Sequence, residues 1–200
     1  MTGVVIPSAG QSNALIAAIA SVPDVPVIVV DDSKDGHVVL EGATVIRSSG
    51  GEGFARSANI GLAEMERRGI GRVLLLNDDA VMAPGALQRL NEAWSDDVGA
   101  LSPVLEEPAG LVYGIIVGSF GRVHLARQPV DVQALSGASL MIRSSERFDV
   151  AYVHGFEDID LCRRLRHRDL QIKCVQGARC EHRGGDTISR RSRWAQRHAV

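Results

Sequence analysis

The chain has 200 residues, of which 45% are hydrophobic and 23% are charged. This composition is that of an ordinary globular protein, and the length suits one domain with a substantial core. The formal net charge of -2 gives no case for bulk nucleic-acid binding. We therefore expect a single domain over residues 1–200 and no nucleic-acid partner.

We expect no segment of the sequence to direct it into or across a membrane. The N-terminal residues 1–7 have no basic region, and no apolar run approaches the roughly 20 residues that a membrane helix needs. Its three cysteines form an odd set without metal-ligand spacing, which is typical of a reducing compartment. We expect a cytoplasmic protein with no transmembrane segment; peripheral attachment to a membrane is an alternative.

Short apolar runs alternate with helical patterns through the first half of the chain. Strands are expected at 3–6, 25–30, 44–46 and 72–76, and helices at 11–21, 54–68 and 84–94. Such alternation predicts a parallel sheet with helices on both faces.

The second half is less regular. It predicts strands at 98–103, 111–117, 138–142 and 171–175, and one clear helix at 155–168. The fold class expected from both halves together is α/β, with a mostly parallel central sheet and a smaller irregular C-terminal half.

Adjacent acids follow two of the expected strands. Asp31 and Asp32 come directly after the run 27–30, and Asn77, Asp78 and Asp79 come after the run 72–76. Because a carboxylate is costly in an apolar interior, these acids must emerge at the carboxyl edge of the sheet, where open α/β folds bind ligands. Carboxylates there suit a divalent cation, and such a cation suits a diphosphate. Ordinary Asx-type turns explain each group, taken alone, at least as well.

Three glycines, Gly50, Gly51 and Gly53, precede the helix expected at 54–68. Small residues before a helix let the backbone approach a phosphate, and a helix N-terminus favours anions. Arg56 and Asn59 lie one turn apart and share a helix face. The match to a dinucleotide-binding fingerprint is weak, because these glycines do not follow the first strand.

The segment 155–165 predicts a helix with acids at its start. If the helix begins near Glu157, Asp158 shares a face with Leu161 and Leu165, whereas Glu157 points elsewhere. A carboxylate on an inward face is unfavourable unless it has a function. Capping of the helix explains one of the two acids, but not both.

His182 follows the last expected strand. A lone histidine is more often a satisfied surface or core residue than a ligand. Near a carboxylate-bound cation, however, its imidazole would suit a first-row metal such as manganese.

Together these motifs resemble the family 2 glycosyltransferases of GT-A fold, in their bacterial rhamnosyltransferase-like branch. The resemblance covers nearly the whole chain in order, through residues 4–7, 29–33, 53–61, 75–79, 137–138, 155–161 and 182–185. It implies a single GT-A domain, with residues 1–100 as the nucleotide-binding half and residues 101–200 as the acceptor and catalytic half. Asn77 departs from the pattern, because it stands where the metal motif of the family begins with an acid.

The resemblance also implies a role for each matching residue. Asp158 would be the general base, while Asp79 and His182 would hold Mn²⁺ or Mg²⁺. The donor-binding residues implied are Pro7, Ser8, Asp31, Asp32, Arg56, Asn59, Asp78 and Gly137. The expected reaction is metal-dependent, inverting transfer of a hexosyl or deoxyhexosyl group from a nucleotide-diphosphate sugar. The acceptor would be a glycan, a lipid-linked intermediate or a small natural product, and a homodimer is one expected assembly.

Two other functions remain open at this point. A sugar nucleotidyltransferase usually carries a Gly-rich loop with Arg and Lys after its first strand, but residues 7–13 contain no basic residue. A non-catalytic homologue that binds nucleotide sugars is the other alternative. The joint presence of Asp79, Asp158 and His182 argues against it.

Overall fold

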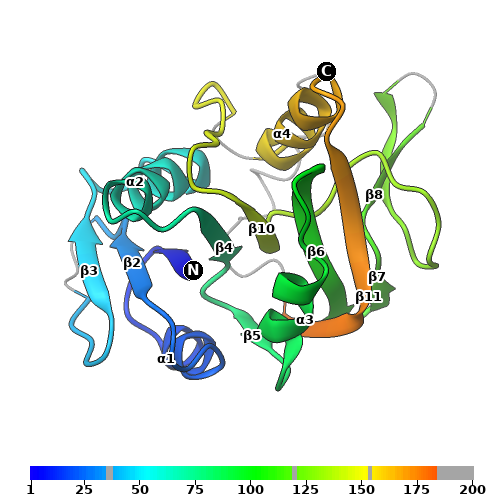
Figure 1. The fold of residues 1–200 in the computed structure, drawn as a ribbon. Coiled ribbons are helices and arrows are strands. Elements are labelled where there is room, and N and C mark those ends of the chain that lie inside the picture. The colour runs from blue at the N-terminus through cyan, green and yellow to red at the C-terminus, as the bar shows by residue number, and fades with distance from the viewer. Residues whose placement is uncertain (35–37, 119–120, 153–154, 184–200) are drawn as a thin grey trace.

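The computed structural model of the protein describes residues 1–34, 38–118, 121–152 and 155–183. These residues form a nine-stranded sheet, a separate two-stranded sheet and four helices (Figure 1). The strands are β1 (Thr2–Ser8), β2 (Val27–Asp31), β3 (Thr44–Arg47), β4 (Arg72–Leu76), β5 (Ala80–Met82), β6 (Val98–Glu107), β7 (Gly110–Val112), β8 (Ile115–Val117), β9 (Val123–Leu125), β10 (Ser139–Arg143) and β11 (Gln171–His182). The helices are α1 (Asn13–Ala20), α2 (Phe54–Arg67), α3 (Ala86–Glu92) and α4 (Glu157–Arg166).

The predicted α/β fold class is confirmed, and the large sheet is mixed. Its N-terminal part has the order β3-β2-β1-β4, in which every pairing is parallel, as the alternation of strands and helices predicts. β10 then pairs antiparallel with both β4 and β6. Beyond β6, β11 runs parallel to β6 and antiparallel to β5. The C-terminal half therefore extends the same sheet with strands of both directions.

Helices cover both faces of the sheet, as expected. α2 and α4 lie on one side and α1 and α3 on the other (Figure 1). Accordingly, Leu62 of α2 belongs to the buried cluster of one face, and Leu90 of α3 belongs to that of the opposite face. The approach of α2 to β1 requires a glycine: a Cβ atom on Gly61 would lie 2.3 Å from Val5 Cγ1. This close packing fixes the first turn of α2 near the carboxyl ends of β1 and β2.

Several strands differ from the sequence-based expectation. β6 continues to Glu107 rather than ending at 103, and β11 continues to His182 rather than ending at 175. The strand expected at 111–117 is divided into β7 and β8, since the backbone of Gly114 (φ 143°) turns there and packs against Ala134. β5 and β9 were not expected, because a three-residue strand has too few side chains to display a period.

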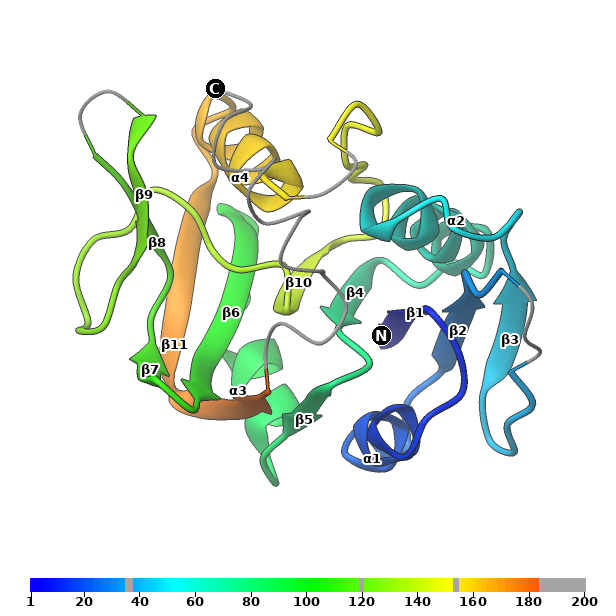
Figure 2. The ribbon, with the colours of Figure 1, turned by 180° about the vertical axis from the view of Figure 1, so that it is seen from behind.

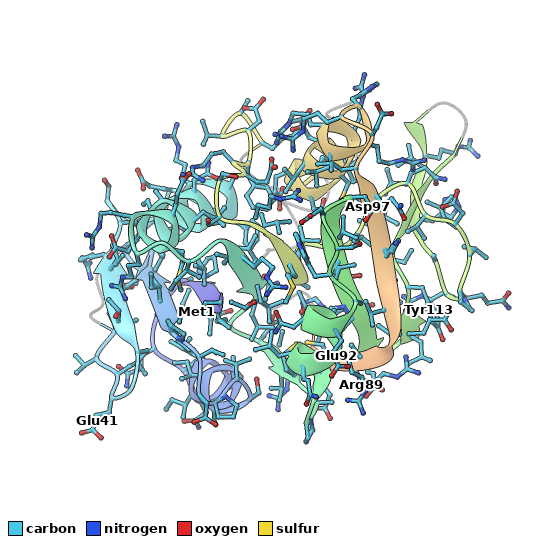
Figure 3. All side chains as sticks on the ribbon, in the orientation of Figure 1. Met1, Glu41, Arg89, Glu92, Asp97 and Tyr113 are labelled. Carbon is cyan, nitrogen blue, oxygen red and sulfur yellow. The ribbon has the colours of Figure 1, made fainter. Side chains whose placement is uncertain are left out.

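The two-stranded sheet β8–β9 stands at the end of the molecule farthest from β3 (Figure 2). Figure 3 labels Tyr113 on this side and Glu41, in the segment before β3, at the opposite end. Among the described residues, none of the helices combines the length and the apolar character needed to span a bilayer.

Candidate functional site

A cavity of about 650 Å³ opens where β1, β2 and β4 end. The first turns of α2 and α4, the residues before β10 and the end of β11 complete its wall. This is the edge at which open α/β sheets bind ligands, and the volume suits a small-molecule ligand. The predicted site residues that line it are Pro7, Ser8, Asp32, Asp78, Asp79, Gly137, Asp158 and His182.

His182 lies between the carboxylates of Asp79 and Glu107. It does so because its strand, β11, lies between β5 and β6. It pairs with Ala80 of β5, next to Asp79, and follows Glu181, which pairs with Glu106 of β6. His182 Nε2 is 3.5 Å from Asp79 Oδ1, and His182 Nδ1 is 3.3 Å from Glu107 Oε1. Burial lowers the pKa of His182, but the hydrogen bonds and negative charges of Asp79 and Glu107 outweigh burial and raise the pKa.

Asp79 and His182 could hold a divalent cation together with the phosphate oxygens of a diphosphate ligand. The part of the chain that the structure describes contains no group of three His, Cys, Asp or Glu side chains able to hold a metal by itself. Mg²⁺ is commonly held by one or two carboxylates together with substrate phosphates, so a pair of protein ligands is sufficient. The imidazole adds a nitrogen ligand of the kind that first-row metals accept.

Asp78 points toward the end of β1. Its Oδ2 accepts a 2.7 Å hydrogen bond from Ser8 Oγ. Burial raises the pKa of Asp78 in spite of this hydrogen bond, and the charge of Asp79 adds to the rise. Ser8 and Asp78 thus form one polar wall of the cavity, beside Asp79.

Asp158 lies in the first turn of α4, after Phe156, whose φ of 71° is rare for a residue with a side chain. Its Oδ2 accepts a 2.9 Å hydrogen bond from Gly137 N, and its Oδ1 accepts a 2.8 Å bond from Ile159 N. Burial raises the pKa of Asp158 and outweighs these two donors. The carboxylate is therefore both fixed in orientation and made a stronger base.

Glu157 differs from the sequence-based expectation, because it lines the same cavity as Asp158 instead of pointing elsewhere. Burial, together with the charge of Asp158, raises the pKa of Glu157 to about 7. Its Oε2 is buried and has no hydrogen-bond partner among the described residues. The start of α4 thus supplies two acids to the cavity.

Asp31 does not line the cavity, although the resemblance implies a ligand contact for it. Its Oδ1 accepts hydrogen bonds from Ser33 N (3.0 Å) and Ser33 Oγ (2.6 Å), and its Oδ2 accepts from Val38 N at 3.1 Å. Arg47 Nη1 lies 3.0 Å from the same Oδ2. These partners surround the buried carboxylate, so in this structure Asp31 links Ser33, Val38 and Arg47.

The neighbouring Asp32 does reach the cavity, where it organises the Gly-rich loop. Its carboxylate accepts hydrogen bonds from Glu52 N at 3.0 Å and Gly53 N at 2.8 Å. Arg56 and Asn59 lie outside the cavity: Arg56 is exposed, and Asn59 exchanges hydrogen bonds of 2.8 and 2.9 Å with the backbone of Phe148. Asn59 therefore ties α2 to the segment before α4.

Sequence reasoning missed several polar residues of the site, among them Ser57 and Glu107. Ser57 lines the cavity and is 1% exposed, and its hydroxyl has no hydrogen-bond partner among the described residues. The small residues Ser57, Ala58 and Gly61 mark the buried face of α2, which was a usable signal. Glu107, the partner of His182, lies beyond the strand expected at 98–103 and carried no signal of its own.

The sequence matches no protein-family model and no curated protein sequence. Solved structures nevertheless share the fold. GalNAc-T7, crystallised with UDP, GalNAc and Mn²⁺, superposes with a TM-score of 0.73 at 12% identity, over 92% of this chain and 44% of that chain. TarS 1–349 of S. aureus, in complex with UDP-GlcNAc, gives a TM-score of 0.59 at 14% identity, over 92% of this chain and 59% of that chain.

A third solved structure, A197 from STIV, gives a TM-score of 0.62 at 12% identity and covers 92% of this chain and 86% of that chain. This chain thus spans less than two thirds of the GalNAc-T7 and TarS chains. Identities this low establish the fold alone. The protein has an α/β fold that matches the fold of glycosyltransferases.

Proposed function

We propose that the protein is a metal-dependent inverting glycosyltransferase of the family 2 type, which uses a nucleotide-diphosphate sugar as donor. The main supporting observation is that one cavity brings together Asp79, His182 and Asp158 from distant parts of the chain. The UDP and Mn²⁺ of GalNAc-T7 and the UDP-GlcNAc of TarS, which share this fold, support a donor of the same chemistry.

The donor diphosphate would lie beside Asp79 and His182. These two residues would hold Mn²⁺ or Mg²⁺ jointly with the phosphate oxygens. Such a cation, when bound, supplies positive charge that stabilises the leaving diphosphate. Ser8 and Asp78, at the end of β1 and β4, would contact the nucleoside part of the donor.

Asp158 would act as the general base. Its carboxylate takes the proton of an acceptor hydroxyl while that oxygen forms a bond to the anomeric carbon. The bond from this carbon to the diphosphate breaks, its electron pair leaves with the nucleoside diphosphate, and the anomeric configuration is inverted. Because burial raises the pKa of Asp158, the carboxylate is better matched to this proton transfer. The N–H groups of Gly137 and Ile159 keep it in place.

A thermal-shift screen tests the donor site. UDP, dTDP, GDP and ADP are each added with and without Mn²⁺, and the melting temperature is measured. A ligand that binds only the folded state raises this temperature, so one diphosphate should do so only with the metal. Asp79→Ala should remove the shift. No shift with any of the four nucleotides would contradict the proposed donor site.

Turnover measurements separate the proposed activity from the two alternatives. A glycosyltransferase releases nucleoside diphosphate from its donor. A sugar nucleotidyltransferase instead releases pyrophosphate from a nucleoside triphosphate and a sugar phosphate. A non-catalytic homologue would give the thermal shift without either product.

A further inference from the structure

We infer that Glu107 is a positioning residue for His182, and that it holds the imidazole ring with Nε2 directed toward Asp79. This inference depends on the proposed metal site and extends it to a residue on a different strand. Glu107 would touch neither the metal nor the donor, and would act through the histidine.

The sheet itself places Glu107 beside His182. β6 and β11 run parallel, with Cys180 opposite Leu105 and Glu181 opposite Glu106. The next residue on each strand is Glu107 on β6 and His182 on β11. On the other side of β11, the antiparallel β5 places Ala80 opposite His182. The histidine is therefore flanked by a carboxylate from each neighbouring strand region.

The two ring nitrogens then face different carboxylates. Nδ1 lies 3.3 Å from Glu107 Oε1, and Nε2 lies 3.5 Å from Asp79 Oδ1. An ionised glutamate can only accept hydrogen bonds, so the contact with Glu107 places a proton on Nδ1. Nε2 is left to act as the metal-binding nitrogen on the side of Asp79. The side chains of His182 and Glu107 are only 12% and 17% exposed, which limits competition from water.

Arg127 holds Glu107 in turn. Its Nη2 lies 3.5 Å from Glu107 Oε2, and its Nη1 donates a 2.9 Å hydrogen bond to the carbonyl of Gly110. One oxygen of Glu107 therefore faces the arginine while the other faces His182. This arrangement of arginine, carboxylate and histidine matches the outer-shell contacts that orient metal-bound histidines, whose removal typically weakens metal binding by about 10- to 100-fold.

The test compares Glu107→Ala and Glu107→Gln with a matched control, Glu106→Gln. Glu106 is the adjacent acid on the same strand, its side chain is 44% exposed, and it lies 3.8 Å from Arg179 rather than beside His182. Binding of Mn²⁺ is measured from the loss of the free-ion signal in electron paramagnetic resonance, with and without UDP. The melting temperature of each variant without metal checks that its fold is intact.

We expect Glu107→Ala to weaken Mn²⁺ binding about 10- to 100-fold, and Glu106→Gln to stay within about twofold of the wild type. Glu107→Gln keeps an oxygen that accepts from Nδ1, so it should recover part of the affinity. It also serves as the test variant if the alanine variant does not fold. A merely structural role would lower the melting temperature without this graded effect on the metal.

The inference is overturned if Glu107→Ala binds Mn²⁺ as the wild type does while His182→Ala does not. If the wild type binds no Mn²⁺ with or without UDP, the proposed metal site fails together with this inference. The two failures are therefore distinguishable. If His182→Ala and Asp79→Ala each bind Mn²⁺ as tightly as the wild type, the ion lies elsewhere. That result would overturn both the proposed metal site and this inference.

Discussion

Oδ2 of Asp158 accepts a 2.9 Å hydrogen bond from the backbone N–H of Gly137. This contact joins the start of α4 to the residues that lead into β10, so the proposed base is fixed to the central sheet. A Cβ atom on Gly137 would lie 3.6 Å from Asp158 Cβ and 3.6 Å from the Phe54 ring, which leaves room for no more than a small side chain. The proposed acceptor oxygen would approach this carboxylate from the open part of the cavity.

Replacing Asp158 by Asn should abolish transfer and spare donor binding. The amide cannot take up a proton, and general-base catalysis contributes roughly 100- to 10,000-fold to a rate. We expect turnover to fall by at least about 100-fold, while the affinity for the nucleoside diphosphate stays within a few fold. Asp160→Asn is the control, since Asp160 pairs with Arg164 at 2.8 Å and does not line the cavity. Near-normal turnover of Asp158→Asn would remove this residue from its role.

Glu157→Gln should stabilise the protein at alkaline pH. The pKa of Glu157 is raised from 4.5 to about 7 in the folded state, so the folded protein binds the proton more tightly than the unfolded chain. The resulting loss of stability is absent below pH 4.5, grows between pH 4.5 and about 7, and is complete above that range. Glutamine removes this penalty, because it carries no charge.

The gain from Glu157→Gln at about pH 8 should be on the order of 1–3 kcal/mol, since one pKa unit corresponds to about 1.4 kcal/mol. Urea unfolding of both proteins at about pH 4 and pH 8 measures it. If the free energies of unfolding of the two proteins differ by the same amount at both pH values, the raised pKa of Glu157 is contradicted.

Asp31→Asn should destabilise the fold while leaving donor affinity unchanged. Burial raises the pKa of Asp31, but the hydrogen bonds from Ser33 and Val38 and the charge of Arg47 outweigh it and lower the pKa. The stabilising contribution is therefore present above pH 3.8 and lost as the pH falls through the lower folded-state value. At neutral pH we expect a loss of about 1–3 kcal/mol in urea unfolding.

The control for Asp31→Asn is Asp96→Asn, at an exposed position. Its free energy of unfolding should change by less than about 0.5 kcal/mol. A large loss of donor affinity in folded Asp31→Asn, with stability intact, would instead restore Asp31 to a ligand-binding role.

Gly61→Ala should destabilise the packing of α2 on β1. The added Cβ would meet Val5 Cγ1 at 2.3 Å, and overpacking of this kind costs about 1–3 kcal/mol. Gly71→Ala is the matched control, because a Cβ there has nothing within 4 Å. Chemical unfolding of both variants makes the comparison, and equal stabilities would show that α2 adjusts freely at this contact.

The apolar runs of the sequence were sufficient to locate the parallel strands and hence the edge where the acids emerge. They could not distinguish Asp31 from Asp32. β2 is buried throughout, so its sequence has no alternation to show which of two successive acids faces the cavity. A similar ambiguity affected Arg56. Its spacing from Asn59 places the two residues on one face of a helix, but it does not show whether that face is directed toward the cavity.

Contacts that depend on the order of strands in the sheet could not be predicted from the sequence. Glu107 meets His182 only because β11 enters the sheet between β6 and β5, and nothing local in either strand specifies that order. Glu157 was misplaced for a related reason: the positive φ of Phe156 turns the start of α4 so that two successive acids reach the cavity. Residues at strand ends could therefore be predicted from the local sequence. Residues that meet across neighbouring strands depend on the order of the strands, which the local sequence does not show.

The most direct test of the proposed function is release of nucleoside diphosphate from a panel of UDP-, dTDP-, GDP- and ADP-sugars, with Mn²⁺ and with a chelator. We predict that the protein turns over at least one donor in the presence of the metal and that the chelator stops this reaction. The variant Asp158→Asn should not release nucleoside diphosphate from that donor. A protein that binds a diphosphate with Mn²⁺ but releases none from any sugar donor, with or without added acceptor glycans, would contradict the proposal.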